Sequence, residues 1–300
     1  VRYDRAGELI DQLKLEISEL MGQAEALDNG DDEDPQALPK EVSRREALRD
    51  KLNAARQRLE ARAKQRAEAE QAYYEAKVAA RDARKGRAKG KHPKPPSDKP
   101  RPEEQSNLSD PDSELMRQSK QHEYRQAYNA QAVVDAEGSQ LILGARVSNC
   151  ASDRNELVAD IAAIPTELGA PGMVLADNGY ANGEEVSSLA EADIEVLVAT
   201  GTEGHRRLHD FRPSKTERPA KEPKTEWLLD MAAKLASEEG RALYKLRQRT
   251  VEPVFGIVKS VLGFTHFSLR GLDKVAGEWD LVSLAYNCKR LHKLKLEMAK

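Results

Sequence analysis

A basic segment in the last fifth of the chain contains a single carboxylate. Between residues 241 and 270 there are six lysines and arginines but only one acidic residue, Glu252. An excess of positive charge indicates a polyanionic partner such as nucleic acid. A lone carboxylate within that charge is a candidate ligand for a metal ion at a phosphate. An amphipathic surface helix with a solvated basic face would explain the same pattern.

The spacing in this segment predicts how a helix would present its charges. Glu252 and Lys259 are seven residues apart, which is two helical turns, so they would share a face. Pro253 lacks an N–H group and fits only a first turn or a kink. We therefore expect a helix to begin near Thr250, with Glu252 at its N-terminus. Apolar residues would form the opposite stripe: Val251, Val254, Phe255, Val258 and Leu262.

Two other short motifs supply further acids. Asp177 follows the apolar run 173–176 and precedes an Asn-Gly pair, which is a turn signal. An acid just past the carboxyl end of a strand lies where open α/β sheets bind ligands, although it could equally accept N–H groups of the turn. Asp110 and Asp112 lie in the motif 107–116, which also fits a turn or a helix cap.

The order of these motifs resembles that of the DDE transposases of bacterial insertion sequences. The phrases NLSDPDSELM, AYNAQAVVD, VLADNGY and VEPVFG follow one another as in the branch of that family with the VEPVFG motif. The closing run FSLRGLDKVAGEWDLVSLAYNCKRL is also similar, so the resemblance covers about residues 105–295. The C-terminal signature of these enzymes is matched by Tyr244, Arg247, Glu252 and Lys259. Four residues separate Arg247 from Glu252, where three are usual. This departure leaves the role of Arg247 open but does not affect that of Glu252.

The resemblance implies an RNase H-like fold and a catalytic triad of Asp110, Asp177 and Glu252, with Asp112 as the alternative first acid. It implies two Mg²⁺ ions, or Mn²⁺, held by the triad, and DNA strand cleavage followed by strand transfer. Two hard cations about 3.5–4 Å apart stabilise the attacking and leaving oxygens of such a reaction. The implied partners are the terminal inverted repeats and target DNA, bound by a homo-oligomer. The implied DNA-contacting residues are Tyr244, Arg247 and Lys259.

The chain that must position these acids divides into three predicted segments. Residues 1–85 read as a helical, coiled-coil-like hairpin. Its apolar stripes are Leu9, Leu13, Ile17 and Leu20, then Leu48, Leu52, Ala55 and Leu59. Residues 86–104 form a basic, proline-rich linker. Residues 105–300 form the predicted catalytic domain.

Within that domain the pattern predicts an α/β fold with a mixed sheet flanked by helices. The runs 127–135 and 140–147 read as a β-hairpin. The runs 173–176 and 194–199 read as strands that alternate with helices. The predicted helices are 154–168, 182–192 and 227–237.

Composition excludes several classes of function and leaves alternatives open. There is no Gly-rich phosphate loop, the six histidines show no zinc-type spacing, and two cysteines make no disulfide framework. No apolar run is long enough to span a membrane, so we expect a cytoplasmic, nucleoid-associated protein. A degenerate or truncated copy, suggested by a chain that starts at Val1, is one alternative. A metal-dependent nuclease of the same fold and a helical adaptor built on residues 1–85 are the others.

Overall fold

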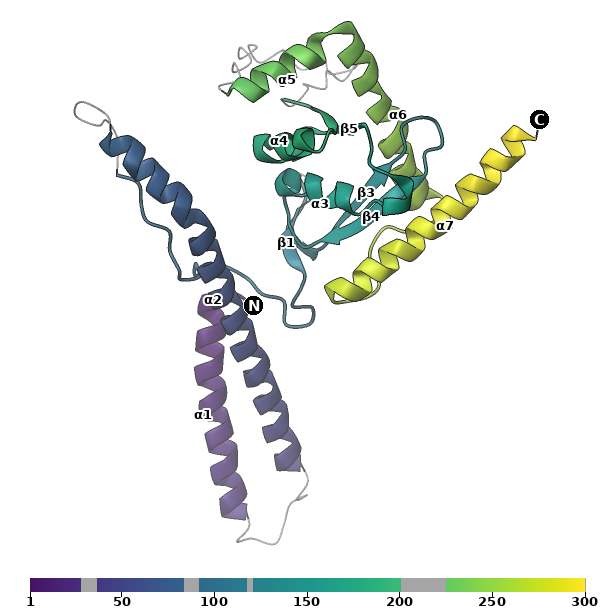
Figure 1. Ribbon diagram of the computed structural model, residues 1–300. Coiled ribbons are helices and arrows are strands. Elements are labelled where there is room, and N and C mark those ends of the chain that lie inside the picture. The colour runs from purple at the N-terminus through teal and green to yellow at the C-terminus, as the bar shows by residue number, and fades with distance from the viewer. Residues whose placement is uncertain (28–36, 84–91, 118–120, 201–224, 300) are drawn as a thin grey trace, which may run out of the picture. The chain divides into compact units, whose positions relative to one another are not determined.

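The computed structural model (Figure 1) shows two compact units, Val1–Leu115 and Met116–Lys300. The residues that it describes are 1–27, 37–83, 92–117, 121–200 and 225–299. The sequence over 202–226 is polar and contains prolines, which predicts a loop, and most of it lies outside these ranges.

Two long helices form most of the first unit. Helix α1 (Tyr3–Leu27) runs antiparallel beside α2 (Ala37–Asp82), as the purple and blue helices of Figure 1 show. Tyr3 at the start of α1 donates a hydrogen bond to Glu60 (2.7 Å), and Glu16 further along accepts one from Arg45 (2.9 Å). The predicted hairpin is therefore confirmed. Its buried seam is Ala6, Ile10, Leu13 and Ile17 against Leu52, Ala55, Leu59 and Ala63.

The chain after α2 returns along this hairpin. The backbone N–H of Tyr3 donates to the carbonyl of Glu104 (2.9 Å), and that of Ser106 donates to the carbonyl of Val1 (2.9 Å). The carboxylate of Glu104 also pairs with Arg66 at 2.6 Å. The last part of the predicted linker and the motif that contains Asp110 therefore belong to the compact first unit. The division into three functional segments stays a prediction.

The second unit contains two pairs of strands. Strand β1 (Glu114–Met116) lies at the junction of the units, and β2 (Arg125–Ala127) precedes a hairpin. In that hairpin β3 (Asn129–Val134) pairs antiparallel with β4 (Ile142–Ser148), as predicted. Strand β5 (Met173–Ala176) pairs parallel with β6 (Glu195–Val198), and α4 (Gly183–Glu191) connects them.

This arrangement confirms a mixed α/β architecture but only part of the expected sheet. In the residues that the structure describes, β3 hydrogen-bonds only with β4, and β5 only with β6. Among the described residues, the strands form separate pairs and not the single mixed sheet expected of an RNase H-like fold. The helix predicted over 154–168 is shorter, because α3 (Leu157–Ala162) ends before Pro165 and 3-10 turns flank it at Asp153–Asn155 (η1) and Thr166–Leu168 (η2).

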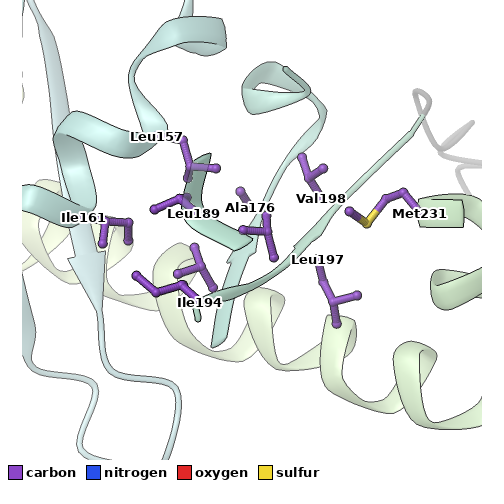
Figure 2. Close-up of a cluster of buried hydrophobic side chains, with 10 residues drawn as sticks. Leu157, Ile161, Ala176, Leu189, Ile194, Leu197, Val198 and Met231 are labelled. Carbon is purple, nitrogen blue, oxygen red and sulfur yellow. The ribbon is translucent and has the colours of Figure 1, made fainter. Parts of the chain in front are cut away.

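Two apolar cores hold the second unit together. The first surrounds the β5–β6 pair and involves helices α3, α4 and α5 (Glu226–Ala236), and Figure 2 labels Leu157, Leu189, Leu197 and Met231 among its side chains. The second joins the β3–β4 hairpin to α6 (Glu238–Ser260) and α7 (Leu272–Met298). Its most buried large residues are Trp279, Tyr286, Val254, Val258 and Val275.

Helix α6 corrects one prediction. It runs without a break from Glu238 through Pro253, so a helix start near Thr250 is wrong. Because proline has no N–H, the carbonyl of Arg249 loses its partner within the helix. The side-chain amide of Gln140, in the β3–β4 turn, donates to that carbonyl at 2.6 Å. A contact from outside the helix therefore satisfies the carbonyl that Pro253 leaves unpaired.

The true start of α6 has its own local cause. The hydroxyl of Ser237 accepts a hydrogen bond from the N–H of Gly240 (2.9 Å), which is a typical N-cap. A Cβ atom on Gly240 would lie 2.0 Å from the carbonyl oxygen of Lys234 at the end of α5. Only glycine therefore allows α5 and α6 to follow one another so closely.

Candidate active site

Asp177 lies directly after β5, as its motif predicted. It caps the short 3-10 turn η3 (Asn178–Tyr180), and its Oδ1 accepts a hydrogen bond from the N–H of Gly179 at 2.7 Å. The side chain is half-buried. The turn thus holds the carboxylate at the carboxyl end of a strand, where ligands bind in open α/β sheets.

A second carboxylate, that of Asp153, lies close to the same turn, and the sequence analysis did not single it out. A Cβ atom on Gly179 would be 2.8 Å from Oδ1 of Asp177 and 3.1 Å from Oδ2 of Asp153. Both carboxylates therefore lie close to Gly179, and a side chain at position 179 would crowd them. The sequence signal for Asp153 was weak, because it is one of ten acids between residues 151 and 200.

Strand β3 holds Asp153 through two amides. Its Oδ1 accepts hydrogen bonds from Asn129 Nδ2 (2.6 Å) and Gln131 Nε2 (2.8 Å). These donors are two residues apart, so they project from the same face of the strand. The hydroxyl of Tyr180 in turn donates to the amide oxygen of Gln131. Burial, and then the negative charge of the surrounding acids, raises the pKa of Tyr180, which stays a neutral donor.

The core anchors this network. The indole Nε1 of Trp279 on α7 donates to the backbone carbonyl of Gln131 at 2.8 Å. The ring of Trp279 stacks on Phe255 of α6, with ring centroids 5.9 Å apart and planes 12° from parallel. The position of Asp153 is thus coupled, through Gln131, to the packing of α6 and α7 on the hairpin.

A separate buried ion group lies beside this network. Arg146 of β4 pairs with Glu156 and, at 2.9 Å, with Asp160, and both carboxylates are almost fully buried. Burial raises the pKa of Asp160 to about 6, although the charge of Arg146 opposes that rise. Ser148 completes the group by donating to Glu156 at 2.9 Å. Because both acids are paired with the same guanidinium, we assign them a structural role.

Glu252 has different surroundings, on the middle of α6. Its side chain is 60% exposed, and its Oε1 lies 3.7 Å from Nη2 of Arg247. The guanidinium of Arg247 lies over the ring of Tyr244, 5.7 Å from its centroid. Nε of Arg247 is buried and has no hydrogen-bond partner among the described residues. Arg247 thus lies close to both Tyr244 and Glu252 on α6, and the roles that the resemblance implies for these residues stay predictions.

Lys259 lies near the C-terminal end of the same helix. Its ammonium group is 5.9 Å from the ring centroid of Phe255, and its side chain is exposed. It shares α6 with Glu252, as predicted, two turns further along. Its proposed contact with DNA is not tested by this geometry and stays a prediction.

The first acid of the predicted triad belongs to the first unit. Asp110 is buried, and its backbone carbonyl accepts hydrogen bonds from the N–H (3.2 Å) and the hydroxyl (2.8 Å) of Ser113. Asp112 is exposed. In the described part of the chain, no group of three or more His, Cys, Asp or Glu side chains surrounds one point. The triad of Asp110, Asp177 and Glu252 therefore stays a prediction, as does the choice of Asp110 over Asp112.

The donor chemistry at Asp177 fits a hard divalent cation. Carboxylate oxygens such as those of Asp177 are the ligands that Mg²⁺ prefers, and Mg²⁺ needs only one or two carboxylates beside its waters. Among the helices of the described ranges, none has the length and apolar character to cross a bilayer.

Comparison with known proteins gives one match. The family model described as transposase DDE domain matches residues 91–288, which is more than half of the chain. The matched range contains Asp110, Asp153, Asp177 and Glu252. No curated protein and no solved structure matches the chain.

Proposed function

This chain belongs to the transposase DDE domain family, and from that premise we propose that it cleaves DNA strands and transfers them, with divalent metal ions, during movement of an insertion sequence. The observation that supports this most directly is the position of Asp177, which a turn holds at the carboxyl end of β5.

The proposed metal-holding acids are Asp110, Asp177 and Glu252, with Mg²⁺ or Mn²⁺ as the ion. When bound, a pair of such ions would stabilise the attacking and leaving oxygens of phosphodiester cleavage. The chain contributes position: the N–H of Gly179 orients Asp177, and Arg247 lies beside Glu252. Asp110 would have to join these acids from the first unit, where Asp112 is the alternative.

The proposed DNA-contacting residues lie on α6. The side chain of Arg247 is partly exposed, and a guanidinium suits phosphate oxygens. Lys259 is exposed on the same helix. Because phosphate contacts release counterions but carry no sequence information, Lys259→Ala should weaken binding to all DNA sequences alike. Its salt dependence should become shallower by about one unit of slope.

The test is Mg²⁺-dependent cleavage of DNA that carries the terminal repeats. Asp177→Asn and Glu252→Gln should each abolish cleavage and leave DNA binding largely intact. Glu239→Gln is the matched control, because Glu239 is an exposed acid in the first turn of the same helix. Cleavage near the wild-type rate by either Asp177→Asn or Glu252→Gln would refute the triad. Asp110→Asn should damage cleavage far more than Asp112→Asn, and the reverse order would move the assignment to Asp112.

The same assay separates the alternatives. A transposase should join the cleaved ends to target DNA, whereas a nuclease of the same fold should cleave without joining. A degenerate copy should do neither although its circular dichroism spectrum shows a folded chain. A copy without end recognition should bind DNA weakly, with dissociation constants of roughly 10⁻⁴–10⁻⁶ M, and without preference for the terminal repeats. The proposed homo-oligomer is tested by the mass of the complex on that DNA.

A further inference from the structure

Helix α7, yellow in Figure 1, is apolar on two opposite faces. One face packs into the core through Val275, Trp279 and Tyr286. The opposite face carries four exposed residues, which we call the outer stripe: Leu281, Leu284, Cys288 and Leu291. The first two of its leucines are 68% and 58% exposed. A surface helix normally turns a polar face outward, and exposed apolar patches mark sites of interaction.

The spacing of the outer stripe is that of a coiled-coil seam. Steps of three, four and three residues separate its members, which is the heptad repeat of two supercoiled helices. The steps continue to Gly277 on one side and Lys295 on the other, and both residues are exposed. Because this order of steps reads the same in both directions, the stripe matches that of an antiparallel copy. A self-complementary patch is what a two-fold dimer interface requires.

The charges of α7 favour the antiparallel orientation. Residues 272–284 contain three acids and one lysine, whereas residues 285–298 contain four lysines and arginines and one glutamate. A parallel pair of these helices would bring like charges together. An antiparallel pair places the acidic half of each helix beside the basic half of the other, which is electrostatically complementary.

We propose that a second copy of this chain docks on the outer stripe, with its own α7 antiparallel to the first. The inference rests on the homo-oligomer of the proposed function and assigns a surface to it. The heptad register places Leu281 opposite Leu291 of the second copy, and Leu284 opposite Cys288 of the second copy. The two-fold axis repeats both contacts, so the seam between the helices is apolar throughout the stripe.

The same register gives Gly277 a role. Glycine weakens a helix interior, and a Cβ atom on Gly277 would meet nothing within 4 Å among the described residues. Packing within its own chain therefore does not demand a small residue there. In the dimer Gly277 lies opposite Lys295 of the second copy and leaves room for that long side chain. The acids Glu278 and Asp280, in the next turn, have the opposite charge.

The first test is the mass of the full chain without DNA, measured by sedimentation equilibrium over a range of concentrations. The wild type should form a dimer of two 33.4 kDa chains. Leu284→Glu should reduce the mass to that of one chain, because it buries a charge in the seam. Leu296→Glu is the matched control and should leave the dimer intact, since Leu296 is 54% exposed on the same helix but lies outside the stripe.

Two results of this test would overturn the inference. A wild type that stays monomeric is expected if another part of the same chain covers the outer stripe. A dimer that Leu284→Glu leaves intact would use a different surface.

Disulfide trapping tests the orientation, in a background of Cys150→Ser and Cys288→Ser. Leu281→Cys together with Leu291→Cys should give a covalent dimer on oxidation, seen on a non-reducing gel. Ten residues of one helix span about 15 Å, which is too far for a disulfide within one chain. Either cysteine alone should give no covalent dimer, because it faces a leucine of the second copy. Trapping by a single cysteine would indicate parallel helices and overturn the proposed docking.

The proposed cleavage and this dimer are read separately. If the wild type cleaves DNA but is a monomer without it, this inference fails and the proposed cleavage stands. If the wild type is a dimer that Leu284→Glu dissociates, but does not cleave, the inference stands and the proposed cleavage fails.

Discussion

Asp177 and Glu252 lie in the same compact unit, but their surroundings differ. Asp177 is half-buried, bonded to a turn N–H, and next to a network that Trp279 ties to the core. Glu252 projects from the middle of a helix, is 60% exposed, and has an arginine 3.7 Å away. The side chain of Asp177 is held by the groups around it, whereas that of Glu252 is positioned mainly by the helix backbone.

The two environments imply different entropic costs when each carboxylate binds a ligand. A carboxylate that is already oriented loses little conformational entropy when it binds a ligand, whereas an exposed glutamate must be ordered at that moment. Changes near Asp177 should therefore alter the stability of the fold as well as the site. Changes at Glu252 should alter the site and leave the fold intact. Three predictions test this contrast, in order of decreasing effect.

The largest effect is expected where the network joins the core. Trp279→Ala removes a side chain that is only 2% exposed, together with its stacking on Phe255 and its hydrogen bond to Gln131. The free energy of unfolding should fall by about 3–5 kcal/mol, measured by urea denaturation followed by circular dichroism.

Leu296→Ala on the same helix is the control, because that side chain is 54% exposed. It should change the free energy of unfolding by less than about 0.5 kcal/mol. If Trp279→Ala lowers the free energy of unfolding by less than about 1 kcal/mol, the contact between Trp279 and β3 does not stabilise the region around Asp177. The proposed difference between Asp177 and Glu252 would then be unsupported.

An intermediate effect is expected at the proline of α6. Gln140→Asn shortens the amide that reaches the carbonyl of Arg249, and asparagine tolerates the φ of 55° at this position. The free energy of unfolding should fall by about 1 kcal/mol, as for one lost hydrogen bond.

A double-mutant cycle sharpens this prediction. In a Pro253→Ala background, residue 253 regains an N–H that can bond the carbonyl of Arg249 within the helix. Gln140→Asn should then cost clearly less, and the two changes should not be additive. Equal costs in both backgrounds would mean that Gln140 does not compensate for Pro253.

The smallest effect is expected at Glu252 itself. Glu252→Gln removes one exposed ion pair, and such pairs contribute about 0–1 kcal/mol. The free energy of unfolding measured in urea should therefore stay within about 1 kcal/mol of the wild type, even if cleavage is lost. A drop of more than about 2 kcal/mol would show that Glu252 supports the fold and would erase the contrast with Asp177.

The sequence predicted much of the fold because the responsible patterns are local. The strand at 173–176, the hairpin that contains β3 and β4, and the two long N-terminal helices follow from apolar periodicity and from turn signals within a few residues. Asp177 was found for the same reason, since an apolar run and an Asn-Gly turn adjoin it.

The features that the sequence did not predict depend on contacts between segments that are distant in the chain. Pro253 predicted a helix start, but the helix continues because Gln140, 109 residues before Arg249 in the chain, takes over the unpaired carbonyl. The residues next to Asp153 in sequence form no motif that would single it out. Its amide partners, Asn129 and Gln131, lie on β3, 24 and 22 residues earlier in the chain. Neither pairing leaves a periodic signal.

The sequence by itself thus determined the element types, the position of Asp177 after a strand and the family of the chain, because each depends on residue identities in linear order. Only the tertiary structure decided which groups come together: Asp153 with Asn129, Arg146 with Asp160, Gln140 with Arg249. The physical reason is that hydrogen bonds and charge pairs act over a few ångströms. Which residues come that close is set by the packing of β3, α6 and α7 around Trp279.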